Sequence, residues 1–247
     1  MPKKITLIEK MLTEGWASDE KEALALVMCG SVLVNDYPAS SIKEKVPTDS
    51  LIRIRGKNNT RYVTRAGMKL EKGLSHFSVL AKGKTCLDIG ASEGGFTDCL
   101  LKHGAAKIYA VDVAYGILDW SLRNNEKVIV LERTNARYLD EKLIPEPIDL
   151  LVSDVSFISL KKILPIAAKL LKPEGLFIVL YKPQFELLPE LLGKNGNVLN
   201  PAEISEGINE MRVFLEKNGI FVRRTAESPI RGSNGNVEYL LYGDIMA

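Results

Sequence analysis

The segment from residue 85 to residue 96 constrains the fold of this chain more than any other. A short apolar strand runs through Asp88 into Gly90, and two further glycines, Gly94 and Gly95, precede an apolar helix-like run. Glycine has no Cβ atom and accepts a positive φ, so glycines clustered after a strand indicate a sharp turn or a ligand against the main chain. The segment therefore predicts a strand, a turn and a helix, with either a cofactor or only a tight connection at the turn.

The spacing of these glycines distinguishes among cofactors. Dinucleotide sites use Gly-x-Gly-x-x-Gly and phosphate loops use Gly-x4-Gly-Lys-Ser/Thr, and the segment has neither pattern. An acid followed by Gly-x3-Gly-Gly suits S-adenosylmethionine, whose amino-acid end binds main chain and carboxylate and carries no phosphate. We predict this cofactor, with contacts from Asp88, Gly90, Ser92, Gly94, Gly95 and Phe96.

Strand-like and helix-like segments alternate from about residue 62 onward, which indicates a parallel α/β sheet. The candidate strands are residues 85–89, 107–113, 128–131, 149–153, 176–180, 220–224 and 237–242. The candidate helices are residues 96–102, 160–171 and 203–218, the last with Asn200 as N-cap, Pro201 at its first position and Gly219 after its end. The pattern predicts a Rossmann-like α/β domain with a seven-stranded sheet.

The first 58 residues mix short helix-like and strand-like segments, and this pattern predicts a small α+β unit. We expect a helix near residues 7–12, a second helix with Ser18 as N-cap that ends before Gly30, a hairpin around residues 32–36 and a strand at residues 51–55. Polar, turn-rich residues follow. The predicted division is therefore a small α+β domain over 1–58, a basic linker over 59–68 and an α/β domain over 69–247.

The composition excludes several classes of function. The formal charge of +2 is nearly neutral and does not by itself argue for a nucleic-acid partner. No apolar run approaches the roughly 20 residues that span a membrane, and we expect a cytoplasmic protein. Scattered cysteines favour reduced core thiols over a disulfide framework. The histidines, His76 and His103, are isolated, so no metal site is predicted.

Basic residues gather between positions 53 and 72, where Glu71 is the only acid. Such a segment could neutralise several phosphates or could simply be a solvated surface. The residues that we expect to bind RNA are Arg53, Arg55, Lys57, Arg61 and Arg65.

Polar residues follow most of the predicted strands. Asp88, Asp112, Asn135, Asp154 and Lys182 stand at or just beyond strand ends. Ligands of open α/β sheets bind beyond the carboxyl ends of strands, so these side chains are expected at one site. Asp112 could accept both ribose hydroxyls of a nucleoside, and Asn135 could bind an adenine edge, although each residue alone could be an ordinary loop residue.

Several long segments together resemble one known family. They are residues 62–70, 85–101, 109–116, 132–137, 154–160, 182–186 and 235–238. In this order they resemble the TlyA-type proteins, historically called hemolysins, which join an S4-type RNA-binding domain to an FtsJ/RrmJ-like S-adenosylmethionine-dependent ribose 2′-O-methyltransferase domain. The resemblance covers nearly the whole chain.

The resemblance implies a catalytic set and a substrate. The matching catalytic positions are Lys69, Asp154, Lys182 and Glu238, and Asp154 is also expected to contact the cofactor. Lys182, held by Asp154, would take or loosen the proton of a ribose 2′-hydroxyl, while Lys69 and Glu238 would position the ribose. The implied substrate is a cytidine of ribosomal RNA within assembled ribosomal subunits, with no obligate protein partner.

Two other classes of function are compatible with parts of the sequence. A noncatalytic RNA-binding factor for ribosome assembly could keep the same fold and cofactor turn. A membrane-lysing hemolysin would fit the old family label, but the chain has no basic amphipathic helix of the membrane-surface kind. The intact catalytic set favours the methyltransferase.

Overall fold

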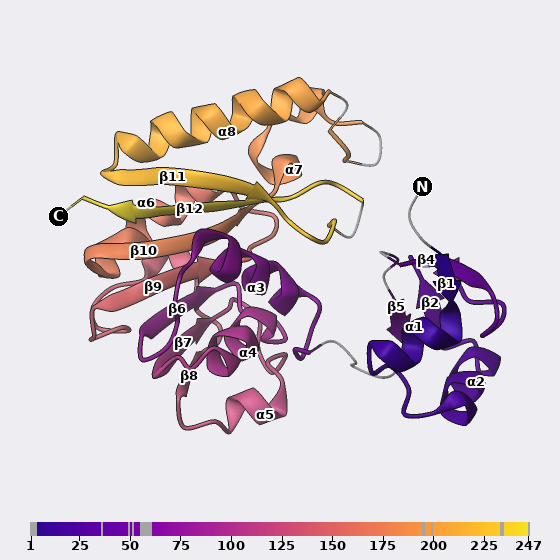
Figure 1. The fold of residues 1–247 in the computed structure, drawn as a ribbon. Coiled ribbons are helices and arrows are strands. Elements are labelled where there is room, and N and C mark those ends of the chain that lie inside the picture. Colours follow the sequence, from indigo (N-terminus) through magenta and orange to yellow (C-terminus); the bar gives the residue numbers. More distant parts are fainter. Residues whose placement is uncertain are drawn as a thin grey trace. The chain divides into compact units, whose positions relative to one another are not determined.

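The computed structural model describes residues 4–35, 37–48, 50, 52–54, 61–193, 196–198, 200–232 and 235–246. The chain divides into two compact units, Met1–Arg61 and Tyr62–Ala247, which Figure 1 draws as ribbons. The boundary falls inside the expected linker over 59–68, because Tyr62 is buried in the core of the second unit. Residues 62–68 therefore belong to the second unit.

The first unit is a small α+β fold. Its described elements are β1 (Lys4–Thr6), α1 (Leu7–Thr13), α2 (Glu20–Met28), β2 (Val32–Val34), β3 (Tyr37–Pro38), β4 (Lys45–Pro47) and β5 (Ile52–Ile54). Strand β1 pairs with β4, while β2 pairs with β3 and β5, all antiparallel. The expected hairpin is therefore present as β2 and β3, although Asp36 lies outside the described residues. The assignment of this unit as an S4-type domain stays a prediction.

The helices of the first unit begin at capping side chains. Thr6 and Glu9 form a reciprocal capping box at the start of α1. The expected N-cap of α2, Ser18, is wrong by one residue, because Asp19 Oδ1 accepts the Glu22 amide at 2.8 Å. Ser18 instead donates from its amide and its hydroxyl to the Glu22 carboxylate, at 2.8 Å each. An aspartate at this position also interacts favourably with the helix dipole.

The second unit is built around one sheet. Its helices are α3 (Ala66–Phe77), α4 (Gly95–Lys102), α5 (Trp120–Arg123), α6 (Leu164–Ala167), α7 (Pro183–Glu186) and α8 (Pro201–Glu216). Its strands are β6 (Thr85–Ile89), β7 (Lys107–Val111), β8 (Val128–Leu131), β9 (Ile148–Ser153), β10 (Leu171–Tyr181), β11 (Ile220–Glu227) and β12 (Tyr239–Ile245). Short 3₁₀ helices lie at Ala136–Tyr138, Leu160–Lys162, Ala168–Leu170 and Pro189–Leu191.

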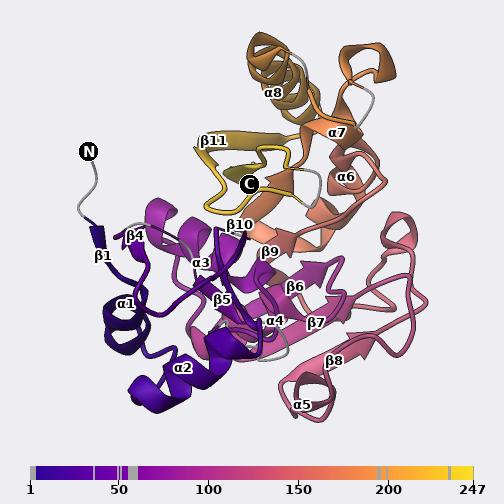
Figure 2. The ribbon, with the colours of Figure 1, turned by 90° about the vertical axis from the view of Figure 1, so that its right-hand side faces the viewer.

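The seven strands are ordered β11-β12-β10-β9-β6-β7-β8. Strands β6 to β10 pair in parallel, whereas β12 is antiparallel to both β10 and β11. The expected all-parallel sheet is therefore wrong for β12, which follows β11 by a hairpin-type connection and inserts between β11 and β10. Figure 2 shows β11 near α8 at one edge and β8 near α5 at the other.

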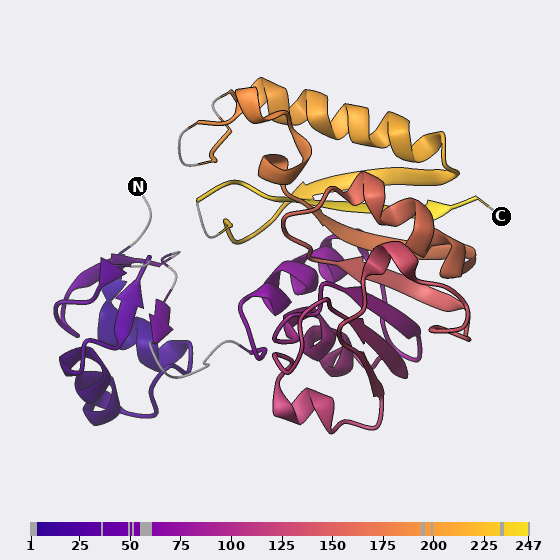
Figure 3. The same cartoon turned by 180° about the vertical axis from the view of Figure 1, so that it is seen from behind.

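Helices cover both faces of this sheet. Successive strand residues point to opposite faces, so Ile178 and Leu180 pack with α3 and α4, whereas Phe177 and Val179 pack with α6 and α8. Figure 1 shows α3 and α4 in front of the sheet, and Figure 3 shows α6 on the other side. Burial on both faces explains why these strands read as continuous apolar runs rather than as alternating ones.

Two expected elements differ from the structure. The helix predicted over 160–171 is broken into a 3₁₀ turn, the short α6 and a second 3₁₀ turn. Pro165, in the first turn of α6, lacks an N–H and its ring would clash with a helix continuing from Lys161, which explains the break before α6. Strand β10 already begins at Leu171, and its pairing with β9 shifts register between Leu171 and Leu176. No helix among the described residues is long and apolar enough to cross a membrane.

Candidate active site

The glycine-rich turn after β6 brings three strand ends close together. The amide of Gly90 donates to the Val111 carbonyl at 2.9 Å, which ties the turn to the end of β7. A Cβ atom on Gly90 would lie 2.9 Å from the main-chain oxygen of Asp154, and the φ of Gly90 is +83°. Both facts require glycine here. The turn therefore packs directly on the main chain that leaves β9.

A first pocket, of about 390 Å³, opens at this edge of the sheet. We call it the turn pocket. Seven of the nine predicted cofactor-binding residues line it, namely Gly90, Ser92, Gly95, Phe96, Asp112, Asn135 and Asp154. Thr64, Ala66 and Glu93 also line it. Asp88 and Gly94 do not, so these two residues support the turn from behind.

Asp112 holds the rim of the turn pocket. Its Oδ2 accepts the Ser92 amide and its Oδ1 accepts the Ala114 amide, each at 2.8 Å. Each carboxylate oxygen has a further lone pair for a ligand hydroxyl. Asn135, on the neighbouring segment, accepts the Arg137 amide at 3.1 Å through Oδ1. Both side chains are therefore fixed by the main chain around them before a ligand arrives.

Asp88 is a buried carboxyl group beneath the turn. Its Oδ2 accepts the Thr97 hydroxyl at 2.6 Å, which joins β6 to α4. Within the described part of the chain its Oδ1 has no hydrogen-bond partner. Burial raises the pKa of Asp88 from 3.8 to about 7, and the carboxylates of Asp154 and Asp112 add to this. The charge of Asp88 therefore changes near neutral pH.

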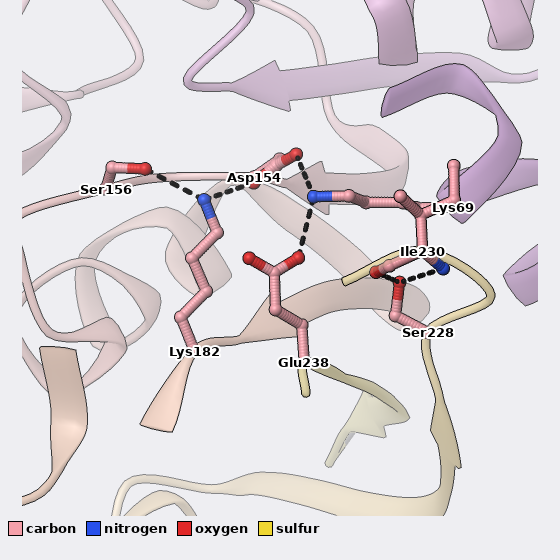
Figure 4. A network of polar contacts seen from close by, with 7 residues as sticks. All are labelled: Lys69, Asp154, Ser156, Lys182, Ser228, Ile230 and Glu238. Atoms are coloured by element: carbon pink, nitrogen blue, oxygen red, sulfur yellow. Dashed lines mark hydrogen bonds and ion pairs between the residues drawn. The ribbon is translucent and has the colours of Figure 1, made fainter. Parts of the chain in front are cut away.

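The predicted catalytic side chains meet beside the turn pocket (Figure 4). Lys69 Nζ lies 2.7 Å from Glu238 Oε2 and 3.5 Å from Asp154 Oδ2. Lys182 Nζ lies 2.6 Å from Asp154 Oδ1 and donates to Ser156 Oγ at 2.8 Å. Asp154 thus stands between two lysines. We call this group the catalytic network after the predicted role of four of its members; it consists of Lys69, Asp154, Lys182 and Glu238 together with Ser156.

The topology of the sheet explains why these side chains, from distant parts of the sequence, lie close together. Asp154 follows β9 and Lys182 follows β10, so both lie at the carboxyl edge of parallel strands. Glu238 precedes β12, and because β12 runs antiparallel its start lies at that same edge. Lys69 comes from α3, which packs across β10 and β12. A Cβ atom on Gly232 would lie 2.6 Å from Glu238 Oε1, so glycine leaves room for that carboxylate.

A second pocket, of about 450 Å³, also borders the catalytic network. We call it the aromatic pocket. Its lining includes Arg65, Lys69, Phe157, Gln184, Phe185 and Glu238. Ser156 and Lys182 line both pockets. Lys182 and Ser156 are therefore placed where the two pockets meet.

Two aromatic side chains mark the aromatic pocket. Phe157 is 91% exposed and has a φ of +64°, which is uncommon for a bulky residue. Its ring centroid lies 5.1 Å from that of Phe185. Neither these rings nor Ser156 was among the predicted site residues. The sequence signal that could have identified Phe157 is an aromatic residue in the polar segment just beyond a strand end, three residues after Asp154.

The predicted RNA-binding residues are described only in part. Arg61 and Arg65 are exposed, and Arg65 lines the aromatic pocket. Arg55, Lys57 and the side chain of Arg53 lie outside the described residues. Lys69, which belongs to the same basic stretch of sequence, is buried and ion-paired. It is therefore not part of a solvated basic surface.

Comparison with known proteins agrees with this architecture. The model of the FtsJ-like methyltransferase family matches residues 62–245. The 16S/23S rRNA (cytidine-2′-O)-methyltransferase TlyA of Mycobacterium tuberculosis is 35% identical over 242 residues, which are 98% of this chain and 90% of that protein. Hemolysin A of Brachyspira hyodysenteriae is 40% identical over 240 residues, 96% of this chain and 98% of that protein.

A solved structure has the same overall fold. A hemolysin-like protein from Streptococcus thermophilus superposes with a TM-score of 0.76 at 35% identity, over 100% of this chain and 90% of that one. The chain therefore belongs to the FtsJ-like methyltransferase family and, within it, to the TlyA-type proteins.

Proposed function

We propose that this protein transfers a methyl group from S-adenosylmethionine to the ribose 2′-hydroxyl of a cytidine in ribosomal RNA. The observation that carries this proposal is the catalytic network at the junction of two pockets, both of which Lys182 lines. The TlyA protein of Mycobacterium tuberculosis, which is similar over nearly the whole chain, is named for this reaction.

The turn pocket has the properties that S-adenosylmethionine requires. Its glycines bring main chain to the surface of the pocket, and Asp112 at its rim can accept hydroxyl groups. Asp154 also lines it and supplies negative charge for a cationic ligand. Bound there, the cofactor would supply a methyl group on a positively charged sulfonium. We infer that Gly90, Ser92, Asp112, Asn135 and Asp154 hold it.

Lys182 is the residue proposed to act on the ribose hydroxyl. A hydroxyl group is a weak nucleophile until its proton is shared with another group. Asp154 and Ser156 fix the position of Lys182 Nζ from two directions, and an amine with two such partners retains a further direction for the ribose oxygen. Lys182 would take the hydroxyl proton or loosen it electrostatically.

Lys69 and Glu238 are proposed to position the substrate and not to move protons. Their ion pair is buried, with side-chain exposures of 8% and 2%. It is therefore a rigid wall of the aromatic pocket, whose exposed Phe157 offers a face for a base outside a helical stack. Much of the catalysis should then come from holding the reacting atoms in line.

The partner and the location follow from the proposed substrate. Arg61 and Arg65 would contact RNA phosphates, which position the RNA without reading its sequence. We expect the substrate to be ribosomal RNA within assembled subunits, without an obligate protein partner. Because ribosomes are cytoplasmic, we expect the protein in the cytoplasm.

Transfer of a labelled methyl group tests the proposal. Ribosomal subunits from cells that lack the protein are incubated with the full chain and methyl-labelled S-adenosylmethionine, and the modified ribose is mapped. We expect label on one or more cytidines, and at least a 100-fold lower rate for Lys182→Ala with unchanged cofactor binding. Absence of label, with cofactor binding intact, would overturn the proposal and favour a noncatalytic assembly factor.

A further inference from the structure

Glu186 is a partly buried carboxylate that lines neither pocket and has no role in the mechanism above. It is the last residue of α7, the short helix that begins directly after Lys182. Its Oε2 accepts the Ser159 hydroxyl at 2.6 Å, and its Oε1 accepts the Leu160 amide at 2.8 Å. One side chain thus forms two hydrogen bonds to a segment 26 residues earlier in the sequence.

These bonds join two segments that both carry catalytic side chains. The segment that follows β9 holds Asp154 and Ser156, and its start is fixed where the Asp154 amide donates to the Ile89 carbonyl at 3.2 Å. Its far end, at Ser159 and Leu160, is bound by Glu186. Segment 154–160 is therefore held at both ends, and the second attachment comes from the segment that starts at Lys182.

The conformation inside segment 154–160 requires such attachment. Phe157 has a φ of +64°, and a left-handed conformation costs a residue with a Cβ atom about 1–2 kcal/mol. Strained residues persist where the surrounding structure holds them. The Phe157 ring also meets Phe185, the neighbour of Glu186, at 5.1 Å between centroids. The two segments are thus joined by polar and aromatic contacts side by side.

We propose that Glu186 is a positioning residue that fixes segment 154–160 against the segment beginning at Lys182 and so sets the distance from Lys182 Nζ to Asp154 and Ser156. The inference rests on the proposed methyl transfer for its effect on rate. An error of about 1 Å in the position of reacting groups costs about 100-fold in rate. Loss of the Glu186 bonds should therefore lower the turnover number and leave ligand binding nearly unchanged.

The surroundings of Glu186 are consistent with a structural carboxylate. Burial raises the pKa of Glu186 from 4.5 to about 6, partly countered by the Leu160 amide, the Ser159 hydroxyl and the positive charge of Lys161. The neighbouring helix α8 presents Glu210, whose carboxylate lies 3.9 Å from Lys161 Nζ. At pH 8 Glu186 is ionised and accepts both hydrogen bonds.

Two substitutions of Glu186 test the proposal in the full chain. Glu186→Ala removes both bonds. Glu186→Gln can retain both, because its amide oxygen can accept the Leu160 amide and its NH₂ can donate to Ser159. Glu190→Ala is the matched control, since Glu190 lies in the same stretch and is exposed. Each variant is assayed at pH 8 with ribosomal subunits for kcat and KM, and by hydrogen exchange at the Leu160 amide.

We expect Glu186→Ala to lower kcat by about 10- to 100-fold and to speed exchange at Leu160, with KM for RNA and cofactor affinity changed less than about 3-fold. Glu186→Gln and Glu190→Ala should stay within about 3-fold of the unchanged protein in both measurements. Should Glu186→Ala fail to fold, Ser159→Ala replaces it, with the difference that it removes one of the two Glu186 bonds and also the bond from the Lys161 amide to the Ser159 hydroxyl.

The results separate this inference from the proposed function. Unchanged exchange at Leu160 in Glu186→Ala would overturn the link between the segments. Faster exchange with an unaltered kcat would overturn the positioning role. If the unchanged protein methylates no RNA, the proposed function and the effect on rate both fail, while the exchange at Leu160 still decides whether Glu186 joins the segments.

Discussion

The buried ion pair of Lys69 and Glu238 permits a quantitative test of the catalytic network. Lys69→Met keeps the length and the apolar stem of the side chain and removes its charge. Glu238, whose side chain is 2% exposed, then remains buried without the partner at 2.7 Å. Asp154 no longer has Lys69 at 3.5 Å but keeps Lys182. The variant therefore isolates the cost of one unpaired buried carboxylate.

The magnitude follows from the geometry. At 2.7 Å and an effective dielectric constant of about 20, the attraction is about 6 kcal/mol, and much of it offsets the cost of burying both charges. Removing one partner of a buried pair costs about 3–5 kcal/mol, a large fraction of the about 5–15 kcal/mol that stabilises a domain. Lys69→Met/Glu238→Gln, which removes both charges, should recover at least about half of the loss.

Native-state hydrogen exchange of amides in β10 and β12 measures the unfolding free energy of this unit in the full chain. Lys102→Met is the control, because Lys102 pairs with Asp98 at 2.9 Å but its side chain is 46% exposed, and such pairs contribute less than about 1 kcal/mol. A loss below about 1 kcal/mol in Lys69→Met, or a double variant less stable than Lys69→Met, would refute the reasoning.

Further predictions concern the turn and the RNA. The pKa of Asp88 rises from 3.8 to about 7 on folding, so its contribution to stability is present below pH 3.8 and lost as the pH rises through 7. Between pH 4 and pH 8 the unfolding free energy of Asp88→Asn should therefore increase relative to that of the unchanged protein, by at most about 4 kcal/mol. A difference in unfolding free energy that stays constant over this range would contradict the prediction. Gly83 has a φ of +74° and open space around it, so Gly83→Ala should lower the unfolding free energy by about 1–2 kcal/mol. Gly90 has a φ of +83° and lies against main chain, so Gly90→Ala should lower the unfolding free energy further and abolish cofactor binding measured by calorimetry. Replacing Arg61 and Arg65 by Ala should weaken binding to ribosomal RNA. The slope of log K against log salt concentration should become less steep by about 0.7–0.9 for each phosphate that the protein no longer neutralises. An unchanged slope would exclude both arginines as phosphate ligands.

Local sequence patterns predicted most of the second unit. The strands expected at residues 85–89 and 128–131 match β6 and β8 at both ends, and the capped start of α8 at Asn200 and Pro201 is confirmed. The turn expected after Ile89 is present, with positive φ at Gly90 and Gly94, a local property that glycine permits. The helix expected over 160–171 is wrong, because Pro165 interrupts that apolar run.

What the sequence by itself determined is the seven strands of the second unit, the glycine turn and, through the family resemblance, the positions of Lys69, Asp154, Lys182 and Glu238. Only the tertiary structure decided that β12 runs antiparallel, which brings Glu238 to the edge where β9 and β10 end. Strand direction depends on which strands pair over long separations, and no local pattern encodes that choice. The same holds for the bonds between Glu186 and segment 154–160, since contacts between distant segments exist only after the sheet has formed.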